Sequence, residues 1–188
     1  MLIIDPSNVL ATEIAKDWAK IITYAFSKEE YDQEYYKEAY YEVHKSSKDK
    51  FMWGFQNFYV VSLLSKFLSS DTESKFLDYI ISSEKGIYYI YDGSLKSPPN
   101  NYCSKQSSRY VSAFELLSNY HLISTKCKHV IKWINENSSG DGFWDMGQTV
   151  KDKIYFPLSN SWRKAINRKI DCTVRMQIIL SNLKNRDI

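Results

Sequence analysis

The feature of this sequence that most constrains its fold is an internal repeat. Two apolar segments with helical spacing end alike, at Leu63-Leu64-Ser65 and at Leu116-Leu117-Ser118. In each copy a short connection and a second helical segment follow, closing at Tyr79-Ile80 and at Trp133-Ile134. Agreement in order, spacing and local residues is typical of arrays of stacked helical units. The predicted unit is a helix, a short turn, a second helix and a long loop.

Both long loops carry a glycine followed by aromatic residues, Gly86-Ile87-Tyr88 in the first copy and Gly142-Phe143-Trp144 in the second. A third helix ending of the same type, Ile179-Leu180-Ser181, lies near the C-terminus. Stacked helical hairpins bury a continuous core between neighbours and place their long loops at one end of the stack. We therefore predict that the two aromatic loops meet on one rim.

The composition agrees with helices packed on helices. The 188 residues include 15% aromatic residues and only 6 glycines, which disfavours a turn-rich β protein. The length suits one domain. We predict a single all-α domain, 1–188, of antiparallel helical hairpins that form an arc or part of an α/α toroid. Its parts are N-terminal helices (1–49), a first repeat (50–106), a second repeat (107–160) and a terminal helix (161–188).

Three segments predict particular helices. Asp5-Pro6-Ser7-Asn8 contains capping side chains and predicts a helix start. The segment 50–70 is apolar on nearly all sides, which predicts one buried inner helix. The last helix, 161–183, is expected to turn its apolar residues inward and its basic residues outward; the inward set is Trp162, Ile166, Ile170, Val174 and Leu180.

Charge, cysteine content and hydropathy limit the classes of function. The net charge of +3 permits a phosphate-bearing ligand but makes nucleic acid an unfavoured partner. Three widely spaced cysteines predict no disulfide framework and indicate a reducing compartment. The apolar run 58–64 is too short for a membrane span, which takes ~20 residues, and the N-terminus does not resemble a signal peptide. We expect a cytoplasmic protein without a membrane span.

The second copy resembles the prenyltransferase and squalene-cyclase repeat, the unit of the α/α toroids of the terpenoid cyclase superfamily. In that repeat a helix leads into an Asp-Gly-x-aromatic loop, as 131–134 leads into Asp141-Gly142-Phe143-Trp144. The stretch 76–88 is similar but lacks the Asp-Gly pair. The resemblance covers about residues 50 to 185 and implies an apolar or isoprenoid ligand between inner helices. The cavity would be lined by Phe51, Trp53, Phe58 and Tyr110.

The catalytic motifs of that family are missing. Its cyclases use an Asp-x-Asp-Asp motif, and the sequence contains no such run. Its protein prenyltransferases bind zinc with an Asp-x-Cys pair and a distant His, whereas Asp171 and Cys172 are adjacent and no His follows them. Cys127 and His129, with His121 nearby, would point apart on a helix. We therefore expect no metal and no cofactor, and the sequence leaves open whether the protein is an enzyme.

The loop carboxylates are the candidates for catalysis. Asp141 and Asp145 could act as general acid and base beside a cavity, with Asp92 and Asp152 on the same rim. The alternative is structural: Asp141 forms an Asx-turn before Gly142, and Asp145 caps the loop.

Aromatic and basic side chains are the candidates for ligand binding: Trp144, Phe143, Tyr88, Trp162, Arg163 and Arg168. Aromatic faces can bind a prenyl chain or a sugar ring, and arginine suits phosphate. The alternatives are again structural. In the structural alternative Trp144 packs back on the helix ends and ties them together. The basic residues then form a solvated helix face, and Glu115 pairs with one of them.

The function that we predict is a non-catalytic helical-repeat module that binds a partner protein, associates with itself or completes a larger toroid. The alternative is a terpenoid-cyclase-like or prenyltransferase-like domain that binds an isoprenoid or another apolar ligand.

Overall fold

The computed structural model describes residues 7–45, 51–150, 159 and 161–184, and within these ranges the chain is helical. The α-helices are α1 (Val9–Ala25), α2 (Gln33–His44), α3 (Phe58–Leu64), α4 (Ser70–Ser82), α5 (Lys105–Leu117), α6 (Ile123–Lys126), α7 (Lys128–Glu136) and α8 (Ala165–Lys184), with a 3-10 turn, η1 (Gln148–Val150). The described residues contain isolated β-bridges but no strand. The all-α prediction is confirmed, whereas the arc or toroid stays a prediction.

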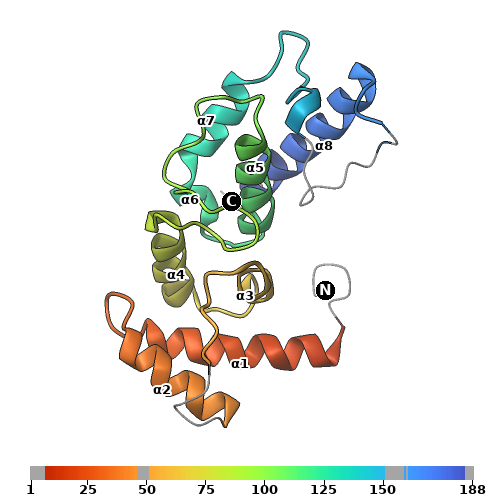
Figure 1. The fold of residues 1–188 in the computed structure, drawn as a ribbon. Helices are drawn as coiled ribbons and strands as arrows, with labels where there is room; N and C mark the ends of the chain where they lie inside the picture. The colour runs from red at the N-terminus through yellow and green to blue at the C-terminus, as the bar shows by residue number, and fades with distance from the viewer. Residues whose placement is uncertain (1–6, 46–50, 151–158, 160, 185–188) are drawn as a thin grey trace.

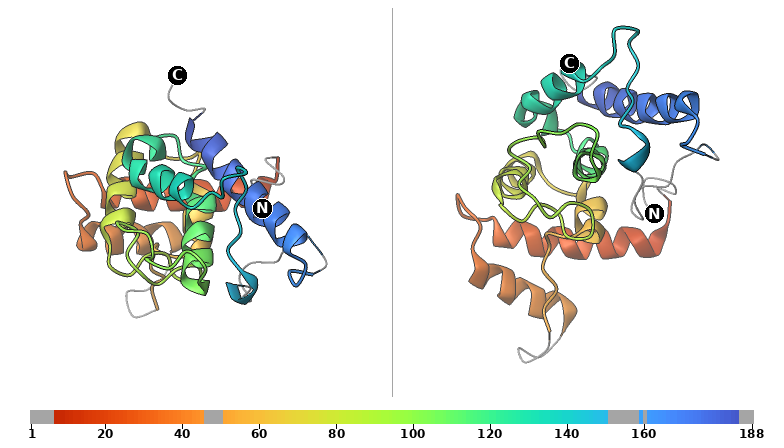
Figure 2. Two further views of the ribbon diagram at one scale, coloured as in Figure 1. Left: turned by 90° about the horizontal axis from the view of Figure 1, so that it is seen from above. Right: turned by 45° about the horizontal axis from the view of Figure 1, so that its top comes forward.

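Two long helices organise the packing. Helix α1 contacts α2, α3 and α4, and helix α8 contacts α5, α6 and α7. Figure 1 shows α3 and α4 between the α1–α2 pair and the C-terminal helices. In the right-hand view of Figure 2, α1 and α8 lie on opposite sides of the shorter helices. The fold therefore has an N-terminal and a C-terminal group of helices, joined where α3 meets α5.

Capping side chains set the starts of most helices. Asn8 Oδ1 accepts a hydrogen bond from Ala11 N at 2.9 Å, which confirms the predicted start of α1. The N-cap side chains of α2, α3, α4 and α5 also accept from backbone amides of the first turn; they are Asp32, Asn57, Ser69 and Ser104. Each cap satisfies an amide that has no partner inside its helix.

Two of the three predicted helix endings lie where the sequence places them. Helices α3 and α5 end at the predicted serines, with Ser65 at φ −56°, ψ −10° and Ser118 at φ −61°, ψ −10°. The third copy differs, because α8 continues through Ile179-Leu180-Ser181 to Lys184.

The prediction of one buried helix over 50–70 is wrong. Between residues 51 and 69 only α3 is helical, and 51–57 is irregular. Tyrosine hydroxyls of α2 hold the backbone of Trp53: Tyr36 donates to its carbonyl at 2.5 Å, and Tyr40 accepts from its amide at 3.3 Å. Asn57 then begins α3 by accepting from Val60 N. These contacts use backbone groups that a continuous helix would need for itself.

The predicted inward face of α8 is wrong at Ile166 and Ile170, whereas Leu180 is buried and Val174 is half-buried. Ile166 and Ile170 are 62% and 48% exposed, whereas Arg168 and Arg175 are buried. The helix turns these arginines inward because each meets a carboxylate there. Trp162 is buried but precedes the helix.

One aromatic side chain joins the two groups of helices. Tyr120, which follows α5 and is completely buried, donates its hydroxyl to Val61 O in α3 at 2.5 Å. Its ring stacks on Phe76 in α4, with centroids 5.8 Å apart. Nearby, the buried Glu73 accepts from Leu122 N at 2.7 Å. The interior between the groups therefore combines apolar packing with satisfied polar groups.

The described helices fall short of a membrane span in length or in hydropathy. None of them is both long enough and apolar enough to cross a membrane.

Candidate functional site

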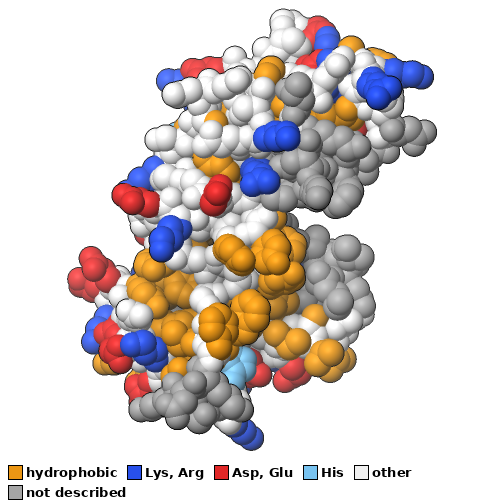
Figure 3. All heavy atoms as spheres, viewed as in Figure 1, with side chains coloured by type: hydrophobic (Ala, Val, Ile, Leu, Met, Phe, Trp, Pro, Cys, Tyr) orange, Lys and Arg blue, Asp and Glu red, His pale blue; other side chains and the backbone are white. Residues whose placement is uncertain are grey.

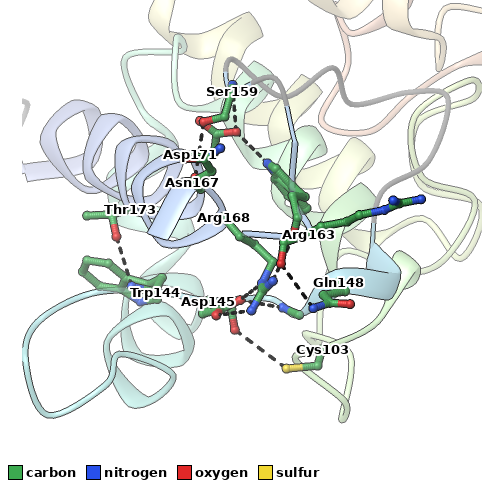
Figure 4. A network of polar contacts seen from close by, with 12 residues as sticks. Cys103, Trp144, Asp145, Gln148, Ser159, Arg163, Asn167, Arg168, Asp171 and Thr173 are labelled. Atoms are coloured by element: carbon green, nitrogen blue, oxygen red, sulfur yellow. Dashed lines mark hydrogen bonds and ion pairs between the residues drawn. The ribbon is translucent and has the colours of Figure 1, made fainter. Parts of the chain in front are cut away.

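The loop after α7 packs against α8 through an ion pair between Asp145 and Arg168 (Figure 4). Arg168 donates from Nε to Oδ1 at 2.5 Å and from Nη2 to Oδ2 at 2.8 Å, and its Nη1 donates to Trp162 O at 2.9 Å. Burial raises the pKa of Asp145, but the hydrogen bonds from Arg168 and from Gly147 N outweigh it and leave that pKa lowered. The carboxylate is therefore ionised, and both of its oxygens accept hydrogen bonds from Arg168.

Asp141 is occupied in a similar way. Its Oδ1 accepts from the Ser139 hydroxyl and from Phe143 N, and its Oδ2 accepts from Lys169 Nζ at 3.1 Å. The Ser139 and Lys169 hydrogen bonds lower the pKa of Asp141 to about 2. The bond to Phe143 N is the Asx-turn that the sequence offered as the structural alternative. Neither carboxyl has the raised pKa that a general acid needs near neutral pH.

The sequence named two further carboxylates, Asp92 and Asp152. Asp92 is exposed in the first long loop, and Asp152 lies outside the described residues.

Trp144 connects α7 to α8. It is 7% exposed, its Nε1 donates to Ile134 O at 2.7 Å, and its backbone N donates to Thr173 Oγ1 at 3.1 Å. Because both its ring and its polar atoms contact the protein, this tryptophan ties helix ends together. Its neighbour Phe143 remains 42% exposed, with Lys169 Nζ 6.0 Å from the ring centroid.

The remaining basic and aromatic candidates near α8 include both buried and exposed residues. Trp162 is buried, and its Nε1 donates to Asp171 Oδ2 at 2.6 Å. Arg163 is exposed, and its carbonyl accepts from Gln148 Nε2 at 3.5 Å. Arg175 pairs with Glu115 at 2.8 Å, as the sequence offered for one of the basic residues. The side chains of Trp144, Trp162 and Arg168 are therefore used inside the protein.

The two long loops contact each other beside Arg168, whereas the backbone of Tyr88 contacts the residues around the start of α3. Cys103 Sγ lies 3.8 Å from the Asp145 carbonyl oxygen, which joins the loops beside Arg168 (Figure 4). Tyr88 N donates to Gln56 O at 3.0 Å, and Tyr88 O accepts from Phe58 N at 3.2 Å. The backbone of Tyr88 is thus held at the start of α3, among residues that the sequence placed in a buried helix.

Exposed aromatic side chains gather there. We call them the aromatic surface: Phe51, Trp53, Phe58, Tyr59, Tyr88 and Tyr89, which are 37–79% exposed. Ring contacts run from Tyr88 to Tyr89 and from Tyr89 to Tyr59, at centroid distances of 4.9 and 6.1 Å. In the view of Figure 3, hydrophobic side chains gather over the middle and lower parts of the molecule. The sequence named Tyr88 as a binding residue but assigned Phe51, Trp53 and Phe58 to an interior cavity, because the apolar residues of 50–70 predicted burial.

A hollow of about 250 Å³ lies within the aromatic surface, lined by Trp18, Trp53, Asn57, Tyr59 and Val60. Both polar atoms of the Asn57 amide have a partner inside the chain: Oδ1 accepts from Val60 N, and Nδ2 donates to Gly54 O. The walls are otherwise mainly aromatic and aliphatic. This hollow is therefore suited to an apolar group.

The backbone beside the hollow is also unusual. Tyr89 has φ 78°, in the left-handed region that residues other than glycine seldom adopt. The ring that this conformation presents is 62% exposed. Unfavourable backbone geometry at an exposed side chain is frequent at binding sites.

A larger hollow, of about 650 Å³, lies between α4 and the α1–α2 connection. Its lining mixes aromatic side chains such as Tyr31 and Tyr79 with both signs of charge. Two of its lysines already form ion pairs, Lys75 with Asp71 and Lys126 with Asp78. Burial raises the pKa of Tyr31 to about 12, so its hydroxyl stays protonated near neutral pH. Charged side chains of both signs therefore share this hollow with its aromatic and aliphatic walls.

The cysteine and histidine candidates for metal binding are separate as well. Burial raises the pKa of the Cys127 thiol to about 12, and His129 Nε2 lies 3.2 Å from Leu95 O. Across the described part of the chain, no three or more His, Cys, Asp or Glu side chains are grouped as a metal site.

We compared the chain with known proteins at three levels. No protein-family model, curated protein or solved structure matches it.

Proposed function

We propose that this protein is a non-catalytic interaction module whose aromatic surface binds a partner protein. The observation that carries the proposal is the size of that surface. With ~200 Å² for the full surface of each aromatic side chain, the exposed fractions correspond to roughly 700 Å². The largest apolar patch on an ordinary monomer is about 300–600 Å², and one side of a standard protein interface buries about 800 Å².

The orientation of the rings favours a protein partner over stacked sugars or bases. The ring planes of the contacting pairs Phe51–Trp53, Phe58–Tyr59, Tyr59–Tyr89 and Tyr88–Tyr89 are 64–86° apart. Such edge-to-face pairs form an uneven surface rather than a flat platform. Side chains of a partner can fit between the rings, as aromatic residues at protein interfaces commonly allow.

The state of the loop carboxylates supports a non-catalytic role. Asp141 and Asp145 are both paired with cations, and both have lowered pKa values. The isoprenoid alternative has less support, because its proposed cavity residues do not share an interior. Tyr110 is completely buried, whereas Phe51 is 79% exposed and Trp53 is 57% exposed.

The proposal is tested by retrieving partners with the immobilised chain from an extract of its source cells. Each retrieved protein would be identified, purified and titrated against the wild type, Trp53→Ala and Tyr88→Ala. We expect both variants to bind at least about tenfold more weakly. The matched control is Ile166→Ala, which changes an exposed apolar residue on α8. If the wild type and both surface variants retrieve the same proteins in equal amounts, the aromatic surface is not the binding site.

A further inference from the structure

We propose that the partner is a second copy of this chain, bound through the aromatic surface of each copy around a two-fold axis. This inference rests on the proposed function, because it names the occupant of the same surface. In the dimer, Phe51 of each copy enters the hollow of the other between Trp53 and Tyr59.

The surface is complementary to itself, as a two-fold interface requires. Phe51 is its most prominent side chain, with 79% of its surface exposed. Its ring lies 5.6 Å from that of Trp53, which forms a wall of the hollow. A protruding ring and a recess therefore lie side by side on one chain. Rotation about a nearby two-fold axis brings each ring to the recess of the other copy.

The hollow has the size and the chemistry to accept a phenyl ring. Its volume is about 250 Å³, and an apolar cavity of about 150 Å³ is large enough for benzene. Its amide-bearing residue, Asn57, has both polar atoms engaged within the chain. A ring that enters therefore displaces water without leaving that amide unpaired, which is the favourable case for burial.

The charge of the surface favours a second copy. A two-fold contact places equivalent residues of the two copies near each other, so a charged surface would repel itself. The six side chains of the aromatic surface are those of phenylalanine, tryptophan and tyrosine, and none of them is an acidic or basic residue. The net charge of +3 on each copy adds only weak repulsion, because physiological salt screens charges beyond about 8 Å.

The area agrees with a stable dimer. Roughly 700 Å² from each copy would bury about 1,400 Å² in all, within the 1,200–2,000 Å² of standard interfaces. The exposed apolar residues of α8, Ile166, Ile170 and Ile178, belong to another element and provide controls.

The test is the mass of the full chain in solution between about 1 and 200 μM, measured by size exclusion with light scattering. We expect the wild type to approach twice 22.1 kDa as its concentration rises. Phe51→Ala and Tyr59→Ala should each dimerise at least about tenfold more weakly, whereas Ile178→Ala should match the wild type. Far-UV circular dichroism and thermal melts verify that each variant is folded. We expect both to fold, because Phe51 and Tyr59 are exposed.

Mixing two variants tests the two-fold geometry. A Phe51→Ala copy keeps its recess, and a Tyr59→Ala copy keeps its protruding ring, so the mixed dimer regains one of the two contacts. Native mass spectrometry should therefore show more mixed dimer than either variant forms alone.

A wild type that stays at 22.1 kDa throughout the concentration range overturns the dimer. So does a Phe51→Ala variant that dimerises as tightly as the wild type. The proposed function fails separately, if partners retrieved by the wild type bind the surface variants equally well.

Discussion

The buried pair of Arg175 and Glu115 offers a sharp test of how α8 is held. Arg175 is 3% exposed and donates to both oxygens of Glu115, at 2.8 and 3.0 Å. It also donates to Ser108 O at 3.2 Å and to Ser112 Oγ at 2.9 Å. In Arg175→Met the apolar stem is largely kept while these bonds are lost. Glu115 then becomes a partly buried carboxylate without its cation.

The expected cost follows from that unpaired charge. Removing one partner of a buried ion pair destabilises a protein by about 3–5 kcal/mol. The Glu115 side chain is 30% exposed, so water can partly replace Arg175, and we expect the lower end, about 3 kcal/mol. For a chain of this length that corresponds to a melting temperature lower by roughly 6–12 °C.

Urea unfolding at pH 7, followed by far-UV circular dichroism, measures this free energy. The control is Lys169→Met, which removes a more exposed pair on the same helix, with side chains 35% and 51% exposed, and should cost less than about 1 kcal/mol. The double variant Arg175→Met/Glu115→Gln should recover part of the loss, because a neutral amide is less costly to leave unpaired. A loss below about 1 kcal/mol for Arg175→Met, or a double variant no more stable than the single one, would refute the reasoning.

Three further outcomes are expected. Trp144→Phe keeps an apolar ring but loses the hydrogen bond to the end of α7, and urea unfolding should show a loss of about 1–2 kcal/mol. In the folded state the pKa of Asp145 is lowered from 3.8, so the pair with Arg168 stabilises the fold above about pH 4. This stabilisation is lost as the pH falls through the folded pKa. Between pH 5 and pH 2, the Asp145→Asn variant should therefore lose less stability than the wild type. A thiol reagent should modify the exposed Cys103 in the native protein. It should modify Cys127 and Cys172 only in urea, because burial raises the pKa of Cys127 to about 12 and that of Cys172 to about 11.

Local sequence signals predicted much of the secondary structure. Asn8 is followed by α1, and the serines after Leu64 and Leu117 end α3 and α5 as expected. These features depend on residues close in the chain, such as a capping side chain and the amide that it accepts from. They can therefore be read without knowledge of the tertiary structure.

The errors arose where distant residues decide the outcome. Tyr36 and Tyr40 bind the backbone of Trp53 across the chain, which prevents the helix that its apolar neighbours predict. Arg175 faces inward because Glu115, far away in the sequence, supplies the compensating charge. Hydrophobic periodicity assigns such arginines to solvent, since it does not include a partner on another helix.

The candidate site shows the same limit. The sequence offered a packing role for Trp144 and an Asx-turn for Asp141, and the structure contains the contacts of both. The sequence assigned Phe51 and Trp53 to an interior cavity rather than to an exposed surface, because their hydrophobicity is the same whether they are buried or exposed. Their exposure depends on the short length of α3 and on the path of the chain before it.

The position of Tyr120 has a consequence for how the molecule unfolds. Its hydroxyl binds Val61 in α3 and its ring packs on Phe76 in α4, although the tyrosine itself follows α5. Opening either group of helices would expose this ring and break its hydrogen bond at the same time. The free energies of opening are therefore coupled, and the helices from α3 to α5 should exchange their protected amide hydrogens through one cooperative event rather than hairpin by hairpin.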